Sequence, residues 1–283
     1  MPRLRIAAID FLNPAPLLYH FEHPPYAAEL ATRYEINYTL PSQCAADLLA
    51  GRADLGLIPI AALTEDLAIV PGCTIASLNK VRSIQLLVRN EKPLAQIRTI
   101  ATDTASRSSL AYTQILFRSF LGTNPAFLPP TPADPIAMLH QADAALLIGD
   151  PALLAIESRE AIEREIGPCT WVDIAEQWTT HTHLPWVAAV WAVRPESLTP
   201  ATATKLIEDL IQSRDAGLAH REDLVREWTP RIALPPAVIR HYLNQNIHYI
   251  LTPACIQAIE LFRKEAAIIQ ALPPLPTLNF LTT

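Results

Sequence analysis

Glycine is scarce in this sequence, with 7 residues among 283, where average usage gives about 20. No GxGxxG or GxxxxGK[ST] pattern occurs, which excludes the glycine-rich phosphate loops of Rossmann-type dinucleotide sites and P-loop enzymes. The four cysteines form neither a CxxC pair nor a metal-ligand spacing. We therefore expect free buried thiols, no metal and no cofactor.

Basic charge and long apolar runs are also missing. The net charge is −6, which gives no basic surface for nucleic acid or an anionic membrane. No run approaches the roughly 20 apolar residues of a membrane helix, and the apolar run after Arg5 is too short for a signal peptide. Half of the residues are hydrophobic. We expect a soluble cytoplasmic protein with real cores and with neither nucleic-acid nor membrane partners.

What the sequence does contain is a succession of short buried strands followed by helices. Residues 34–40 and 55–60 read as strands with a helix at about 43–50 between them, which predicts a parallel crossover. Further strands are expected at 3–9, 68–71, 74–77, 82–89, 99–102, 142–148 and 187–193. Helical spacing then follows in 200–228, 235–251 and 253–272, each with a proline near its start.

This order predicts two α/β lobes with a cleft between them. The first lobe is expected to be discontinuous, residues 1–89 plus 190–283, and the second to span 90–189. Ligands of open parallel sheets bind beyond the carboxyl ends of strands. The loops at 10–14, 41–43, 103–109 and 149–150 fall there and hold the polar residues of interest.

The segment DTASRSS, residues 103–109, predicts an anion site. Ser106, Ser108 and Ser109 surround Arg107 after a strand and at the start of a helix. Free backbone N–H groups, hydroxyl donors and the positive end of the helix dipole all favour a carboxylate there. The alternative is simple helix capping by Ser106 or Thr104.

Single polar residues in the other loops leave two interpretations each. The Asn13 amide can donate to and accept from a ligand, or it can be a turn residue before a proline. Ser83 faces the cleft or is an ordinary half-buried serine, and Ser42 caps the helix at 43–50. Asp150 is an acid or base, or it caps the helix that starts at Pro151.

Two histidines, His181 and His183, could form one side of a metal site on a strand, but no third ligand is near in sequence. A solvated or lid-like pair is the better interpretation. No Ser–His–Asp triad, Cys–His pair or carboxylate dyad can be argued from spacing. An enzyme with these residues would therefore depend on binding geometry rather than on a strong protein base.

Six segments in this order resemble the chorismate dehydratase family, which acts in the futalosine route to menaquinone. They are FLNPAPL (11–17), GRADLGLIP (51–59), VRSIQL (81–86), DTASRSS (103–109), ADAALLIGDPAL (142–153) and LPWVAAVWAV (184–193). The resemblance runs from residue 5 to about 262. It implies an α/β periplasmic-binding-protein type II fold, and a lyase that converts chorismate to 3-[(1-carboxyvinyl)oxy]benzoate and water.

The resemblance also implies roles for residues. Asn13 matches an asparagine at the reacting centre and is the expected catalytic residue. Ser83 matches a substrate-contacting serine, and residues 106–109 match a helix start that receives a carboxylate. We add Ser42 and Asp150 as expected substrate-binding residues. With no strong base in the motifs, the enolpyruvyl carboxylate of chorismate is expected to take the proton.

The sequence departs from the family at several positions. Ser108 stands where the family usually has Thr, and Asn79-Lys80 where it often has Gly-Pro. His183 stands for Gly and Trp186 for Phe, both on the loop before the last strand, so the pocket wall is expected to differ there.

Two alternatives remain open at this point. A solute-binding protein for a small carboxylate would have the same two lobes without chemistry. The related 1,4-dihydroxy-6-naphthoate synthase would need a catalytic histidine in its cleft, for which His181 or His183 is the nearby candidate.

Overall fold

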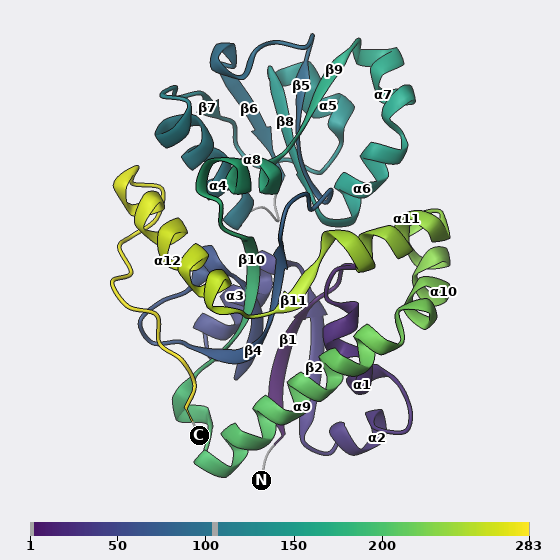
Figure 1. The fold of residues 1–283 in the computed structure, drawn as a ribbon, viewed down its shortest axis with the longest axis vertical. Coiled ribbons are helices and arrows are strands. Elements are labelled where there is room, and N and C mark those ends of the chain that lie inside the picture. Colours follow the sequence, from purple (N-terminus) through teal and green to yellow (C-terminus); the bar gives the residue numbers. More distant parts are fainter. Residues whose placement is uncertain (1–2, 104–106, 283) are drawn as a thin grey trace.

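The computed structural model describes residues 3–103 and 107–282, and within them the chain forms two β-sheets, each covered by helices. Figure 1 shows the two sheets one above the other, with the C-terminal helices around the lower one. Ser106, one of the expected anion-site residues, lies outside the described residues. No helix in the described ranges is long and apolar enough to cross a membrane.

The larger sheet has six strands in the order β11-β4-β10-β3-β1-β2. Strand β1 pairs in parallel with both β2 and β3, which confirms the predicted parallel crossover, whereas β10 runs antiparallel to β3 and β4. The strands are β1 (Leu4–Ile9), β2 (Tyr34–Thr39), β3 (Leu55–Pro59), β4 (Ala68–Ser77), β10 (Trp186–Val193) and β11 (His248–Ile250).

The smaller sheet has five strands in the order β7-β6-β8-β5-β9. Strand β6 is parallel to β7 and β8, and β5 is antiparallel to β8 and β9, so this sheet is mixed as well. The strands are β5 (Ile84–Arg89), β6 (Thr99–Thr102), β7 (Ala126–Phe127), β8 (Ala144–Ile148) and β9 (Cys169–Asp173).

The two connections between the sheets lie earlier in the chain than the expected boundaries near residues 90 and 190. Because β5 belongs to the smaller sheet and β10 to the larger one, the chain crosses at 78–83 and again at 183–185. The polar turn after β5 is a local reversal in which Asn90 and Glu91 have positive φ. Lys92 of this turn forms an ion pair with Asp143, which directly precedes β8 of the smaller sheet, with Nζ 2.5 Å from Oδ1.

The helices divide between the two sheets. Beside the larger sheet lie η1 (Ala15–Leu18), α1 (Tyr19–Glu22), α2 (Ala27–Leu30), α3 (Pro41–Leu49), η2 (Ile60–Ala62), η5 (Pro195–Ser197), α9 (Pro200–Ala219), α10 (Arg221–Ile232), α11 (Pro236–His241), η6 (Tyr242–Asn246) and α12 (Pro253–Ile268). The others are η3 (Leu94–Gln96), α4 (Arg107–Ile115), η4 (Leu116–Phe120), α5 (Pro135–Gln141), α6 (Gly149–Glu157), α7 (Arg159–Ile166) and α8 (Ile174–Thr182).

The C-terminal helices were predicted in outline but not in their bounds. The stretch 200–228 is two helices that meet at His220, and 235–251 is a short helix, a π-helical turn and the strand β11 rather than one helix. Strand β11 completes the edge of the larger sheet beside β4. The C-terminal segment therefore returns to the end of β4, where the chain crosses to the smaller sheet. This places it beside the site described below.

Strand β10 forms the centre of the core. It lies between β3 and β4, and nearly all of its residues are buried, including Trp186 and Trp191. All four cysteines are free and buried, as expected from the sequence. A strand buried on both faces reads as a continuous apolar run, which explains why the sequence shows this strand so clearly.

Candidate functional site

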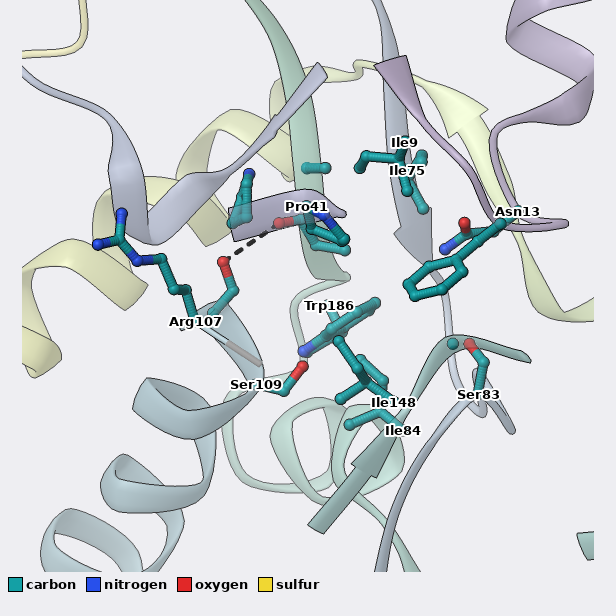
Figure 2. A pocket seen from close by; sticks show the side chains of 16 residues that line it. Ile9, Asn13, Pro41, Ile75, Ser83, Ile84, Arg107, Ser109, Ile148 and Trp186 are labelled. Atoms are coloured by element: carbon teal, nitrogen blue, oxygen red, sulfur yellow. Dashed lines mark hydrogen bonds between the residues drawn. The ribbon is translucent and has the colours of Figure 1, made fainter. Parts of the chain in front are cut away.

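A pocket lies between the two sheets, lined by residues from both. It encloses about 510 Å³ of empty space, including its open mouth. Figure 2 shows Asn13 and Ser83 on one side, Arg107 and Ser109 on the other, and Trp186 between them. Five of the eight residues predicted from the sequence line this pocket: Asn13, Ser83, Arg107, Ser108 and Ser109.

Asn13 follows strand β1 and directly precedes Pro14 and the short helix η1. Its Oδ1 atom is buried and makes no hydrogen bond within the described residues. Gly217 of α9 positions this loop, since a Cβ there would lie 2.1 Å from the carbonyl oxygen of Pro16. A buried amide oxygen without a donor indicates a ligand group that would provide one.

Hydrogen bonds hold the backbone of Ser83 and of the two residues before it. It is only 2% exposed, and its carbonyl oxygen accepts a 2.8 Å hydrogen bond from the N–H of Gly149. The connection before it is held by Asp173, whose carboxylate accepts from the N–H of Arg82 at 2.7 Å and of Val81 at 3.1 Å. Burial raises the pKa of Asp173 against the lowering effect of these hydrogen bonds.

The Ser83 hydroxyl has a partner that the sequence did not reveal. Tyr242, in the π-helical turn η6, donates a 2.7 Å hydrogen bond from its phenol to Ser83 Oγ. Burial raises the pKa of this phenol far above its ordinary value, so Tyr242 stays protonated and acts as the donor. The Ser83 proton is then free to point toward a ligand.

Helix α4 brings the serine-rich segment to the pocket. Ser108 is engaged with the larger sheet, because its Oγ accepts from Ala61 N at 3.2 Å and donates to the Ala188 carbonyl at 3.3 Å. Ser109 is 4% exposed and lines the pocket. Arg107 is exposed and pairs with no described carboxylate. The first N–H groups of a helix also lack intrahelical acceptors, so this end of the pocket offers donors.

Two predicted substrate-binding residues do not line the pocket. Ser42 is the second residue of α3, which begins at Pro41 with Leu40 before it and has no side-chain cap. The predicted cap is therefore wrong, because Pro41 occupies the first helical position and itself reaches the pocket.

Asp150 instead forms hydrogen bonds between the two lobes. Its carboxylate accepts hydrogen bonds from the N–H of Leu12 at 3.1 and 3.3 Å, and it does not cap α6, which already begins at Gly149. Burial raises the pKa of Asp150 to about 6. Asp103 accepts from the N–H of Ile148 at 3.2 Å and lies outside the pocket lining.

The histidine pair is solvent-exposed, as the preferred interpretation expected, although it lies at the end of a helix and not on a strand. His181 lies in the last turn of α8, and His183 ends that helix with φ +59°. Both side chains are exposed, and the His181 ring stacks on Phe120 with ring centroids 4.6 Å apart. No histidine occurs among the described residues that line the pocket.

The fold places the chain in a class. Protein AF1704 from Archaeoglobus fulgidus is 14% identical and has a TM-score of 0.72, covering 95% of this chain and 98% of its own. The aliphatic sulphonate-binding protein SsuA from Escherichia coli is 17% identical with a TM-score of 0.64, covering 96% of this chain and 88% of its own. The chain therefore has an α/β periplasmic-binding-protein-like fold, as the family resemblance implied, and both of its sheets are mixed.

The sequence places it in a family as well. Residues 4–267 match the family described as "Menaquinone biosynthesis", so the chain belongs to that family. It is also similar to the chorismate dehydratase of Thermus thermophilus, with 27% identity over 229 residues that cover 77% of this chain and 81% of the relative. The family-level resemblance drawn from the six sequence segments is thus confirmed.

Proposed function

We propose that this protein is a chorismate dehydratase that converts chorismate to 3-[(1-carboxyvinyl)oxy]benzoate and water. The observation that carries the proposal is the pocket itself, where Asn13 and Ser83 from one side meet Arg107, Ser108 and Ser109 from the other. The name of the Thermus thermophilus relative supports the same reaction.

The reaction matches the groups that are present. Chorismate carries two carboxylates and a ring hydroxyl. The C–H bond beside the ether oxygen and the neighbouring C–OH bond break, the hydroxyl leaves with the proton as water, and the ring becomes aromatic. Aromatisation supplies much of the driving force, so the protein has to orient the substrate and stabilise the charge that develops.

The described lining contains no Asp, Glu or His side chain that could serve as the base. We therefore assign proton abstraction to the substrate's own enolpyruvyl carboxylate. Asn13 would orient the leaving hydroxyl by accepting a hydrogen bond from it at the unpaired Oδ1, and its amide N–H groups can donate to the departing oxygen. The donors at the start of α4 and the Ser83 hydroxyl would hold the carboxylates.

Incubating the purified protein with chorismate tests the proposal. Loss of the diene absorbance, together with a mass-spectrometric product lighter by one water, is the expected result. Unchanged chorismate with measurable binding would instead indicate a solute-binding protein, and hydroxybenzoate as sole product would contradict the dehydratase reaction.

Asn13→Ala tests the assigned chemistry within that assay. It should lower kcat by at least about 100-fold, the usual scale for a group that stabilises charge in a transition state, while product binding weakens far less. Asn37→Ala, in the exposed part of β2, is the matched control and should turn over like wild type. Wild-type kcat in Asn13→Ala would contradict the role.

A further inference from the structure

Trp186 is the first residue of β10 and forms part of the pocket wall. Its side chain is 1% exposed, yet its indole nitrogen Nε1 has no hydrogen-bond partner among the described residues. An indole N–H can only donate. A buried donor without an acceptor is unfavourable, so its presence at a pocket wall needs an explanation.

Two aromatic side chains beside Trp186 have their polar groups satisfied. Trp178 donates from Nε1 to the Pro185 carbonyl at 3.0 Å, and Tyr112 donates to the Val187 carbonyl at 3.0 Å. Tyr112 also packs against the Trp186 ring, with centroids 5.6 Å apart. Among these three side chains, the one donor without an acceptor in the described part of the chain belongs to Trp186, the residue that reaches the pocket.

The polar groups around Trp186 determine which chemical group of a ligand could bind there. Trp186 lies between the α4 end of the pocket and the Asn13 side, with its indole nitrogen turned toward the Ser109 side in Figure 2. Ser109, the guanidinium of Arg107 and the first N–H groups of α4 are donors, and none of the described lining residues has a carboxylate side chain. An anionic acceptor fits this end, and a cation does not.

We propose that the Nε1–H of Trp186 donates a hydrogen bond to a carboxylate oxygen of the bound ligand and so gains the acceptor that it lacks among the described residues. The identity of the natural ligand rests on the proposed function. The contact itself requires only a planar carboxylate seated between Trp186 and the start of α4.

Indole NMR tests the contact without relying on activity. The five tryptophans of the ¹⁵N-labelled protein give five indole signals, and the signal missing in Trp186→Phe identifies Trp186. On titration with isophthalate, and separately with 3-[(1-carboxyvinyl)oxy]benzoate, the Trp186 indole proton should move downfield. Dimethyl isophthalate, which has the same ring without charge, shows how far the signal moves without a carboxylate, and it should cause a much smaller shift at the same concentration.

Affinity provides the second readout. Trp186→Phe keeps an aromatic ring but removes the donor, and it should raise the Kd of both dicarboxylates about 10- to 100-fold, as expected for a hydrogen bond to a charged acceptor. Trp191→Phe is the matched control. Trp191 is on the same strand, is 0% exposed and also has an unpaired Nε1, but it does not line the pocket, so binding should not change.

The possible outcomes separate the two proposals. Binding with an unmoved Trp186 signal, unchanged affinity in Trp186→Phe, an equal loss in Trp191→Phe, or no dicarboxylate binding at all would each overturn the contact. Wild-type protein that binds dicarboxylates through Trp186 but leaves chorismate unchanged would refute only the dehydratase activity.

Discussion

The phenol of Tyr242 donates a 2.7 Å hydrogen bond to Oγ of Ser83, linking the C-terminal segment to the pocket. Both side chains are almost completely buried, and they lie 159 positions apart in the sequence. Because the tyrosine supplies the proton in this contact, Ser83 is left with its own proton for a ligand. Tyr242 is therefore a positioning residue that acts through Ser83.

Tyr242→Phe should weaken substrate capture while leaving the chemical step largely intact. We expect KM for chorismate to rise about threefold to tenfold with little change in kcat, because an ordinary hydrogen bond contributes about 0.5–1.5 kcal/mol. In a Ser83→Ala background the same substitution should have little further effect on KM, since its target is gone. Steady-state kinetics of the two single variants and the double variant measure this.

Tyr249→Phe is the control for this experiment. Tyr249 is also buried, but its hydroxyl has no hydrogen-bond partner in the described part of the chain, so removing it should leave KM unchanged and stability equal or slightly higher. If Tyr249→Phe raised KM as much as Tyr242→Phe, a general packing effect would account for the result, and the contact to Ser83 would not.

Gly149 permits the close approach of the two lobes beside the pocket. Its φ is +63°, and an added Cβ would lie 2.7 Å from the ring of Phe11. Gly149→Ala should therefore lower the free energy of unfolding and raise KM, because Phe11 also lines the pocket and would have to move. Urea denaturation and chorismate kinetics measure the two effects.

Gly122→Ala separates the energetic cost of a positive φ from the cost of the steric overlap with Phe11. Gly122 has nearly the same φ, +65°, but nothing lies within 4 Å of its added Cβ. It should lose about 1–2 kcal/mol from its left-handed backbone alone, with normal KM. Gly149→Ala should lose about 1–3 kcal/mol more, and an equal loss in the two variants would exclude the contact with Phe11 as the cause.

The sequence predicted those features that depend on local pattern. The parallel unit of β2, α3 and β3 and the helix after residue 106 follow from apolar periodicity and from stop signals, which are local properties. Placing Asn13 and Ser109 in one pocket followed from topology, because the carboxyl ends of strands meet where lobes face each other.

Features that depend on long-range packing could not be predicted from local sequence pattern. The turn at 90–93 has the composition of a linker, and only the pairing of β5 with β8 shows that the chain has already crossed. Tyr242 lies in a π-helical turn inside a stretch with ordinary helical spacing, and nothing near it in sequence points to Ser83. The hydrogen bond between Leu12 and Asp150 likewise could not be predicted from the sequence near either residue.

The carboxyl group of Asp150 should make stability depend on pH. Burial raises its pKa from 3.8 to about 6, with Asp10 adding to the shift and the Leu12 N–H opposing it. The folded state therefore binds more protons than the unfolded state between about pH 4 and pH 6. The free energy of unfolding must then fall as pH rises through this window, and the loss is complete above it.

Asp150→Asn removes this slope and keeps an oxygen acceptor for the Leu12 N–H. The variant should match wild type near pH 4 and be more stable above pH 6, by at most about 3 kcal/mol, since two pKa units correspond to about 2.7 kcal/mol. Asp10→Asn should keep the slope but move it to lower pH, because one of the charges that raises the pKa of Asp150 is gone. Urea denaturation of the three proteins from pH 4 to pH 8 measures these differences, and parallel curves for wild type and Asp150→Asn would show that Asp150 does not titrate in this window.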